Sequence, residues 1–143
     1  MRIRKFIVAA AAAAALGTTG ALAAPALAST QCPSHTLQFT VVNTASMSPT
    51  ESTRAGQGTD VNSEGKTIGF DVIYETLKAR VFTANAAFST TGGLLYVTIS
   101  SSDGGQTYSG KVTGGTGVFG GATGTVTSKS ISSSKTAVTI IYR

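Results

Sequence analysis

Three glycines have the spacing of a phosphate-binding loop. Gly115, Gly117 and Gly120 form a literal G-x-G-x-x-G pattern, which in dinucleotide-binding proteins ends a strand and opens a helix, so that the pyrophosphate lies at the helix N-terminus. Here the residues that follow, 123–127, alternate threonine with glycine and valine and predict a strand. No acidic residue after Asp103 could bind a ribose. We therefore interpret the segment as a tight bend that packs an aromatic ring inward, formed by Gly114, Gly115, Gly117, Phe119, Gly121 and Gly124.

Residue types that commonly carry metal or acyl-transfer chemistry are scarce. His35 is the only histidine and Cys32 the only cysteine, so no cluster completes a zinc site. A hydrolytic triad would depend on His35, which has no acid near it in the sequence. Cys32 cannot form an internal disulfide, and we interpret it as a minor feature or a contact with another chain. We expect no metal and no other cofactor.

Two tyrosines are candidates for contact with an organic ligand. Tyr74 and Tyr96 lie in alternating segments that predict strands. A tyrosine that faces a cavity shapes it with its ring and donates one hydrogen bond through its hydroxyl. Packing in the core with a satisfied hydroxyl is the alternative, and both interpretations stay open at this point.

The elements that position these residues are predicted to be strands. Runs of β-branched and aromatic residues alternate with Gly, Ser and Asn turns, and no stretch after the N-terminal segment has helical periodicity. The spacing of roughly ten residues per strand and turn is typical of consecutive hairpins in a sandwich or a barrel. The predicted strands are 36–42, 67–76, 79–88, 94–100, 107–113, 123–128 and 136–142, with a weaker eighth at 57–61.

Two segments refine this picture. The last predicted strand carries apolar side chains on both faces, which favours a closed barrel whose outside also meets another subunit. Residues 44–59 contain Pro49, Gly56, Gly58 and many small polar residues, with Met47 as the only large apolar side chain. We predict a long flexible loop over 44–59, either a lid over one barrel mouth or a plain solvated loop.

The first 28 residues are predicted to be a cleaved export signal. Arg2, Arg4 and Lys5 precede an apolar run over 6–16, and small residues follow at Ala26-Leu27-Ala28. Residues 17–20 interrupt the apolar run before it reaches the roughly 18 to 20 residues of a membrane span. Cleavage would leave residues 29–143 as a single secreted domain with no membrane segment.

Cleavage also changes the charge balance. The signal holds three of the 11 basic residues and none of the six acidic ones, so its removal lowers the net charge from +5 to +2. The remaining cations are scattered singly among serines and threonines. No basic stripe follows a phosphate backbone, and nucleic acid is therefore not an expected partner.

A family resemblance lies in the glycine segment. Residues 114–126, GGTGVFGGATGTV, resemble the G-G-T-G-x-[YF]-x-x-A-x-G-x-[VA] signature of the dirigent and allene oxide cyclase barrel superfamily. The segment 65–69, the pair Gly92-Gly93 with the run behind it, and the final strand occur in the family's order, so that the likeness covers about residues 57–143. The resemblance is to a secreted, bacterial-type member of the superfamily.

This resemblance implies an eight-stranded antiparallel β-barrel with an apolar cavity, often trimeric, in which a bound reactive molecule is held in one conformation before it cyclises or couples. Dirigent proteins place acids and an arginine in the cavity, and the nearest candidates here are Asp71, Glu75 and Arg80. The chain departs from the plant cyclases, which rely on an acid in the first strand, because residues 36–42 contain none.

Two functions follow as expectations. The first is a secreted barrel that binds a small apolar or aromatic molecule and guides its cyclisation or isomerisation, with the two tyrosines and the three charged candidates at the ligand. The second is a non-catalytic secreted structural or surface-interaction protein that acts through its outer face or loops. In either case the chain could form a homo-oligomer, a dimer or a trimer.

Overall fold

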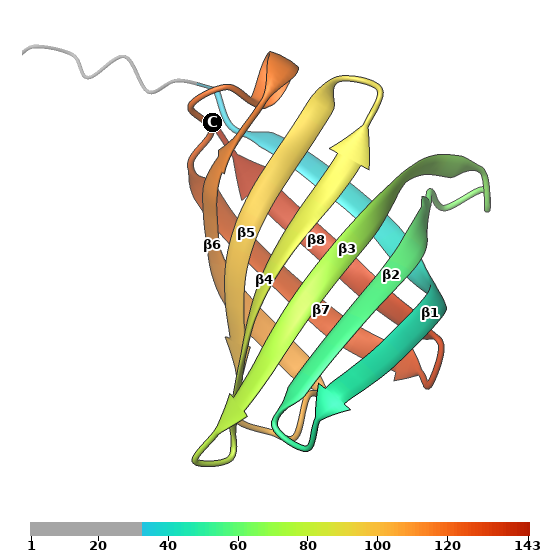
Figure 1. Cartoon of the computed structure of the whole chain (residues 1–143). Coiled ribbons are helices and arrows are strands. Elements are labelled where there is room, and N and C mark those ends of the chain that lie inside the picture. The colour runs from blue at the N-terminus through green and yellow to red at the C-terminus, as the bar shows by residue number, and fades with distance from the viewer. Residues whose placement is uncertain (1–32) are drawn as a thin grey trace, which may run out of the picture. The chain divides into compact units, whose positions relative to one another are not determined.

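The protein is a closed, eight-stranded antiparallel β-barrel (Figure 1). The structure, a computed structural model, describes residues 33–143; the predicted export signal and Cys32 lie outside them. The strands are β1 (His35–Thr50), β2 (Thr53–Val61), β3 (Thr67–Lys78), β4 (Val81–Thr90), β5 (Gly93–Ser101), β6 (Thr107–Gly115), β7 (Gly124–Ser132) and β8 (Lys135–Tyr142), with a 3₁₀ turn, η1 (Gly117–Phe119), between β6 and β7. The predicted fold class is confirmed.

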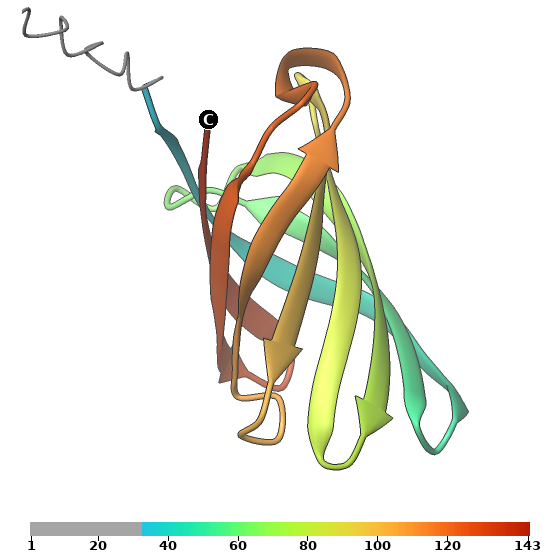
Figure 2. The same cartoon turned by 90° about the vertical axis from the view of Figure 1, so that its left-hand side faces the viewer.

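Each strand pairs with the next one in the chain, and β8 pairs with β1 to close the barrel. The connections β1–β2, β3–β4, β5–β6 and β7–β8 all lie at one end, which we call the hairpin end. The start of β1, η1 and the C-terminus lie at the other end, which we call the η1 end (Figures 1 and 2). Among the described residues, no helix has the length and hydrophobicity that a membrane-spanning helix needs.

The prediction of a long loop over residues 44–59 is wrong. This segment forms the second half of β1 and most of β2, joined by the two-residue turn Glu51-Ser52. The small residues signalled close packing and not flexibility: a Cβ built on Gly58 would lie 2.5 Å from both Val41 Cγ1 and Asp71 Oδ1. Threonines at the turn also bind one another, with the hydroxyls of Thr50 and Thr53 2.7 Å apart.

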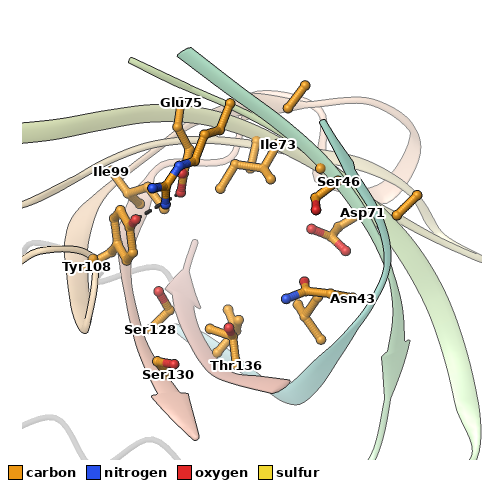
Figure 3. Close-up of a pocket in the computed structure, with 18 of the residues that line it drawn as sticks. Asn43, Ser46, Asp71, Ile73, Glu75, Ile99, Tyr108, Ser128, Ser130 and Thr136 are labelled. Atoms are coloured by element: carbon orange, nitrogen blue, oxygen red, sulfur yellow. Dashed lines mark hydrogen bonds between the residues drawn. The ribbon is translucent and has the colours of Figure 1, made fainter. Parts of the chain in front are cut away.

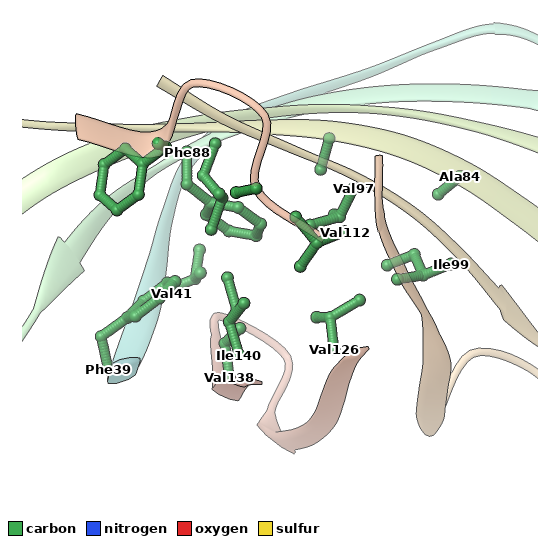
Figure 4. Close-up of a cluster of buried hydrophobic side chains, with 14 residues drawn as sticks. Phe39, Val41, Ala84, Phe88, Val97, Ile99, Val112, Val126, Val138 and Ile140 are labelled. Carbon is green, nitrogen blue, oxygen red and sulfur yellow. The ribbon is translucent and has the colours of Figure 1, made fainter. Parts of the chain in front are cut away.

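Buried apolar side chains from several strands pack together in the barrel interior (Figure 4). Leu95 and Ile140 are fully buried, and the rings of Phe39 and Phe88 meet edge to face at 5.2 Å. This cluster of apolar side chains stabilises the fold, since burial of each large apolar side chain contributes about 1.5–3 kcal/mol.

The glycine-rich segment forms the β6–β7 connection at the η1 end. Gly114, Gly117 and Gly121 have positive φ angles, which let the chain leave β6, form η1 and return into β7 within a few residues. This path carries Phe119 into the core, where it is 4 % exposed and meets Tyr142 edge to face at 5.4 Å.

The two faces of β3 are assigned by the structure. Phe70, Val72 and Tyr74 point outward and are half exposed, whereas Asp71 and the alternate residues that follow it face the barrel interior. The aromatic face of this strand is thus the outer face, and the face that bears the acids is the inner one.

Candidate functional site

A cavity of about 390 Å³ occupies the half of the barrel nearest the hairpin end. Its deep part is apolar and is lined by Val41, Ala86, Phe88, Ile99, Val126 and Val138. Nearer the mouth, the same strands present polar side chains: Val41 is followed by Asn43 on β1, and Val126 by Ser128 and Ser130 on β7. Figure 3 shows the labelled side chains from several strands converging on this space.

The inner face of β2 contributes few large side chains to the barrel interior. Its inward positions are Arg54, Gly56, Gly58 and Asp60, because these alternate with outward residues and pair with the inward positions of β3. The two glycines contribute no side chain between the arginine near the mouth and the aspartate further in. Gly58 is covered by Val41 and Asp71, whereas Gly56 lines the cavity.

Two carboxyl groups are buried beside this glycine wall. Asp71 is 5 % exposed and lines the cavity, and Asp60 is 1 % exposed and lies behind the cavity wall. Among the described residues, neither oxygen of Asp60 nor Oδ1 of Asp71 has a hydrogen-bond partner. Buried polar atoms without partners are rare because each costs about 1–3 kcal/mol, and they mark sites that call for an explanation.

Burial raises the pKa of both carboxyl groups. The pKa of Asp60 rises to about 7, first because burial disfavours the charged form and second because Asp71 carries a like charge. The pKa of Asp71 rises to about 6 through burial, which the backbone N–H groups of Asp71 and Gly58 oppose only in part. Both carboxyl groups therefore titrate nearer to neutral pH than an exposed aspartate does.

A second polar group lies nearer the mouth. The Tyr108 hydroxyl donates a hydrogen bond of 2.9 Å to Glu75 Oε1, shown dashed in Figure 3. Arg54 is the register partner of Glu75 and lines the same cavity, with its guanidinium 5.3 Å from the centre of the Phe82 ring. Burial and the bond to Glu75 raise the pKa of Tyr108 above its usual value, so that this residue stays a neutral donor.

The residues predicted from the sequence divide into three groups. Asp71 and Glu75 line the cavity. Tyr74 and Tyr96 lie on the outside of the barrel, where they border a shallow groove of about 310 Å³ across β3, β4 and β5. Arg80 lies in the β3–β4 turn with a φ of 66° and does not line the cavity.

Sequence reasoning missed Asp60, Arg54 and Tyr108. Arg54 lies in the segment 44–59, for which the sequence predicted a loop. Asp60 lies in the weak predicted strand 57–61, for which no inner face was predicted. The usable signal was the alternation Gly56, Gly58, Asp60, which is an isolated acid on a face that otherwise lacks side chains.

One further acid has a structural role. Asp103, in the β5–β6 turn, accepts hydrogen bonds from the hydroxyls of Ser101 and Thr107 and from the backbone N–H groups of Gln106 and Thr107. These bonds, those from Thr107 most of all, hold the pKa of this exposed carboxyl well below its usual range. Within residues 33–143 no three His, Cys, Asp or Glu side chains gather as a metal site would require.

The fold is that of known dirigent and cyclase barrels. Pyocyanin demethylase superposes with a TM-score of 0.66 at 13% identity, over 76% of this chain and 100% of that one. An exo-specific intermolecular Diels-Alderase gives 0.65 at 8% identity (78% and 98% covered), and a pterocarpan synthase dirigent protein 0.58 at 16% (77% and 84%). No protein-family model and no curated protein matches the sequence.

Proposed function

We propose that the protein is exported and binds a small, largely apolar or aromatic molecule in its barrel cavity, where it guides cyclisation or isomerisation of that molecule. The observation that carries this proposal is an open cavity, apolar at its depth, into which the buried carboxyl of Asp71 projects, with its Oδ1 lacking a hydrogen-bond partner among the described residues.

The size and lining of the cavity support binding. A volume of about 390 Å³ lies within the range of about 300–1,000 Å³ that is typical of ligand pockets. The apolar depth gains free energy from covering apolar ligand surface, while the few polar groups fix the orientation of the ligand. A barrel kept only for stability would have filled this space with side chains.

The chemistry proposed is orientation together with proton transfer. A flexible molecule held in one conformation reacts faster because its ends need not find each other by diffusion. Asp71 can accept or return a proton near neutral pH, and the neutral Tyr108 hydroxyl can donate a hydrogen bond to a developing negative charge. Barrels of this fold include a Diels-Alderase and a cyclase that catalyses a [4 + 2] cycloaddition.

The test combines ligand capture with a variant that fills the cavity. Native mass spectrometry of protein purified from the culture medium should show a co-purified small molecule, and N-terminal sequencing should show cleavage after Ala28. Ser128→Leu, which projects into the cavity, should abolish the adduct. Thr127→Leu changes the adjacent, outward-facing residue and should retain it. Equal adduct levels in both variants, or a retained Met1, would contradict the proposal.

A second candidate function is surface interaction, and one observation favours it. Phe70, Val72, Tyr74 and Tyr96 form an exposed apolar patch across β3 and β5, with Ala87 of β4 between them in register. Patches of this kind on soluble proteins often mark contacts with another chain. The double variant Val72→Lys/Tyr96→Lys should lower the mass in sedimentation velocity if copies associate through this face; an unchanged mass would leave the patch without that role.

A further inference from the structure

We propose that the cavity selects ligands that carry a protonated amine, with Asp71 as the counter-ion. This inference rests on the proposed function, because it names the chemical class of the ligand that the same cavity takes.

The direction in which Asp71 can find a partner is fixed by its surroundings. Its Oδ1 lies against the backbone of Gly58, where a Cβ would be only 2.5 Å away, and the ring of Phe88 belongs to the register partner on the other side, in β4. The remaining direction is the cavity, into which the carboxyl points between Asn43 and Ser46 (Figure 3). A further partner for this carboxyl group must therefore come from the cavity side, from a ligand or from solvent.

The charges around the cavity leave this acid unmatched. Arg54 is the cation among the cavity-lining residues, and it faces Glu75 near the mouth, so that these two charges offset each other. Asp60, the nearest other charge, has the same sign as Asp71.

The other strands do not change that balance. β1, β7 and β8 present Asn43, Ser46, Ser128 and the similar neutral side chains of Ser130 and Thr136, and β6 presents the neutral Tyr108. β4 and β5 contain no charged residue at all. The interior of the described barrel therefore carries a surplus of negative charge when Asp71 ionises.

A cation gains more from this arrangement than a neutral hydroxyl does. Folding has already removed the carboxyl from water, so the ligand does not have to bear that desolvation on binding. An ammonium group adds Coulomb attraction to its hydrogen bond, and charge-assisted hydrogen bonds are roughly twice as strong as neutral ones. An anionic group would be repelled by both aspartates.

Asp60 cannot touch the ligand, because it is 1 % exposed and does not line the cavity. Burial raises the pKa of Asp71 to about 6, whereas burial and the like charge of Asp71 raise the pKa of Asp60 to about 7. Asp60 therefore stays protonated until Asp71 has ionised, and Asp71 is the group whose charge meets the ligand. Amine binding should consequently strengthen as the pH rises from 5 to 8 and should release protons.

The experiment is isothermal titration calorimetry of the mature protein with matched amine and alcohol probes of graded size: benzylamine and benzyl alcohol, then the naphthylmethyl and anthracenylmethyl pairs. At pH 8 the amine of the best-fitting pair should bind at least tenfold more tightly than its alcohol, and this ratio should fall toward one at pH 5. Repetition in buffers of different ionisation enthalpy should show proton release near pH 6.5.

Variants separate charge from shape. Asp71→Asn should remove the amine preference while alcohol binding persists, and Asp60→Asn should keep the amine preference. Glu64→Gln, in the exposed β2–β3 turn, is the control and should change neither. Equal binding of amine and alcohol by the unmodified protein at pH 8 would overturn the inference while leaving cavity binding intact. Binding of none of the six probes would contradict the proposed function itself.

Discussion

Gly58 lies directly beneath the carboxyl group of Asp71: the two residues are partners in the β2–β3 ladder, and a Cβ on Gly58 would lie 2.5 Å from Oδ1. The same Cβ would also lie 2.5 Å from Val41 Cγ1, so two neighbouring side chains would have to move together. The glycine thus determines both where the acid sits and how much room remains beside it.

The first prediction concerns this contact. Gly58→Ala should lower the free energy of unfolding by about 1–3 kcal/mol, the usual cost of forcing extra volume into a packed interior. Gly120→Ala is the matched control, because its φ of −56° suits alanine and its nearest neighbour would be 3.4 Å away. Urea denaturation of both variants measures the difference. Equal stability would contradict the prediction, because it would mean that Asp71 and Val41 move aside without cost.

The second prediction concerns the pH dependence of stability. Both aspartates have a higher pKa in the folded chain than the usual aspartate value of 3.8, so the folded state binds more protons than the unfolded state at intermediate pH. Their contribution to stability is therefore fully present below about pH 4 and is lost as the pH rises through 6 and 7.

Asp60→Asn should flatten this decline and should be more stable than the unmodified protein at pH 8 by about 1–3 kcal/mol, since an unpaired charge is removed from the interior. Thermal unfolding from pH 5 to pH 8 measures the effect. A rise in the melting temperature of the unmodified protein over this range would contradict the raised pKa values.

The third prediction concerns the β3–β4 turn. Ala79 and Arg80 have φ angles of 50° and 66°, a left-handed conformation that costs roughly 1–2 kcal/mol for a residue with a Cβ. Asn-Gly is the preferred pair for a two-residue turn of this type. The double variant Ala79→Asn/Arg80→Gly should therefore raise the free energy of unfolding by about 1–2 kcal/mol in chemical denaturation.

This variant also tests Arg80 as a ligand-binding residue. Because Arg80 lies outside the cavity, the stabilised variant should bind the calorimetric probes with unchanged affinity. A large loss of affinity would restore the assignment made from the family resemblance.

The fourth prediction concerns the closed end of the barrel. Phe119→Ala should lower the free energy of unfolding by about 3–5 kcal/mol, because the ring is buried and packs against Tyr142. Val118→Ala, at the adjacent residue with 75 % exposure, should change it by less than about 0.5 kcal/mol. Similar losses in both variants would mean that the whole turn, and not the ring, maintains the closure.

The fold could be predicted from the sequence because its signals are local. Turn residues such as Asn62 and Gly65, and period-two runs such as the one over 67–76, fix strand positions from neighbouring residues alone. The segment 44–59 escaped because its strand character depends on neighbours: Gly58 is extended and buried owing to Val41 and Asp71, which are distant in sequence.

The sequence predicted only part of the candidate site, because the inner face of a strand also depends on residues that are distant in sequence. Alternation separates Asp71 from Tyr74 onto opposite faces, but it does not say which face is inside. On β3 the usual preference is reversed, since Phe70 is 60 % exposed while Asp71 is buried. Only closure of the barrel, which sets the curvature of all eight strands together, decides between them.

Phe119 and Tyr142 pack together at the η1 end, while the polar residues that line the cavity lie toward the hairpin end. A ligand that enters from the hairpin end passes Arg54, Glu75 and Tyr108 and leaves by the same route. A bound ligand therefore blocks the entry of a second ligand until it has dissociated. The residence time of the occupant, and not the supply of new ligand, would set the rate at which the barrel can be reused.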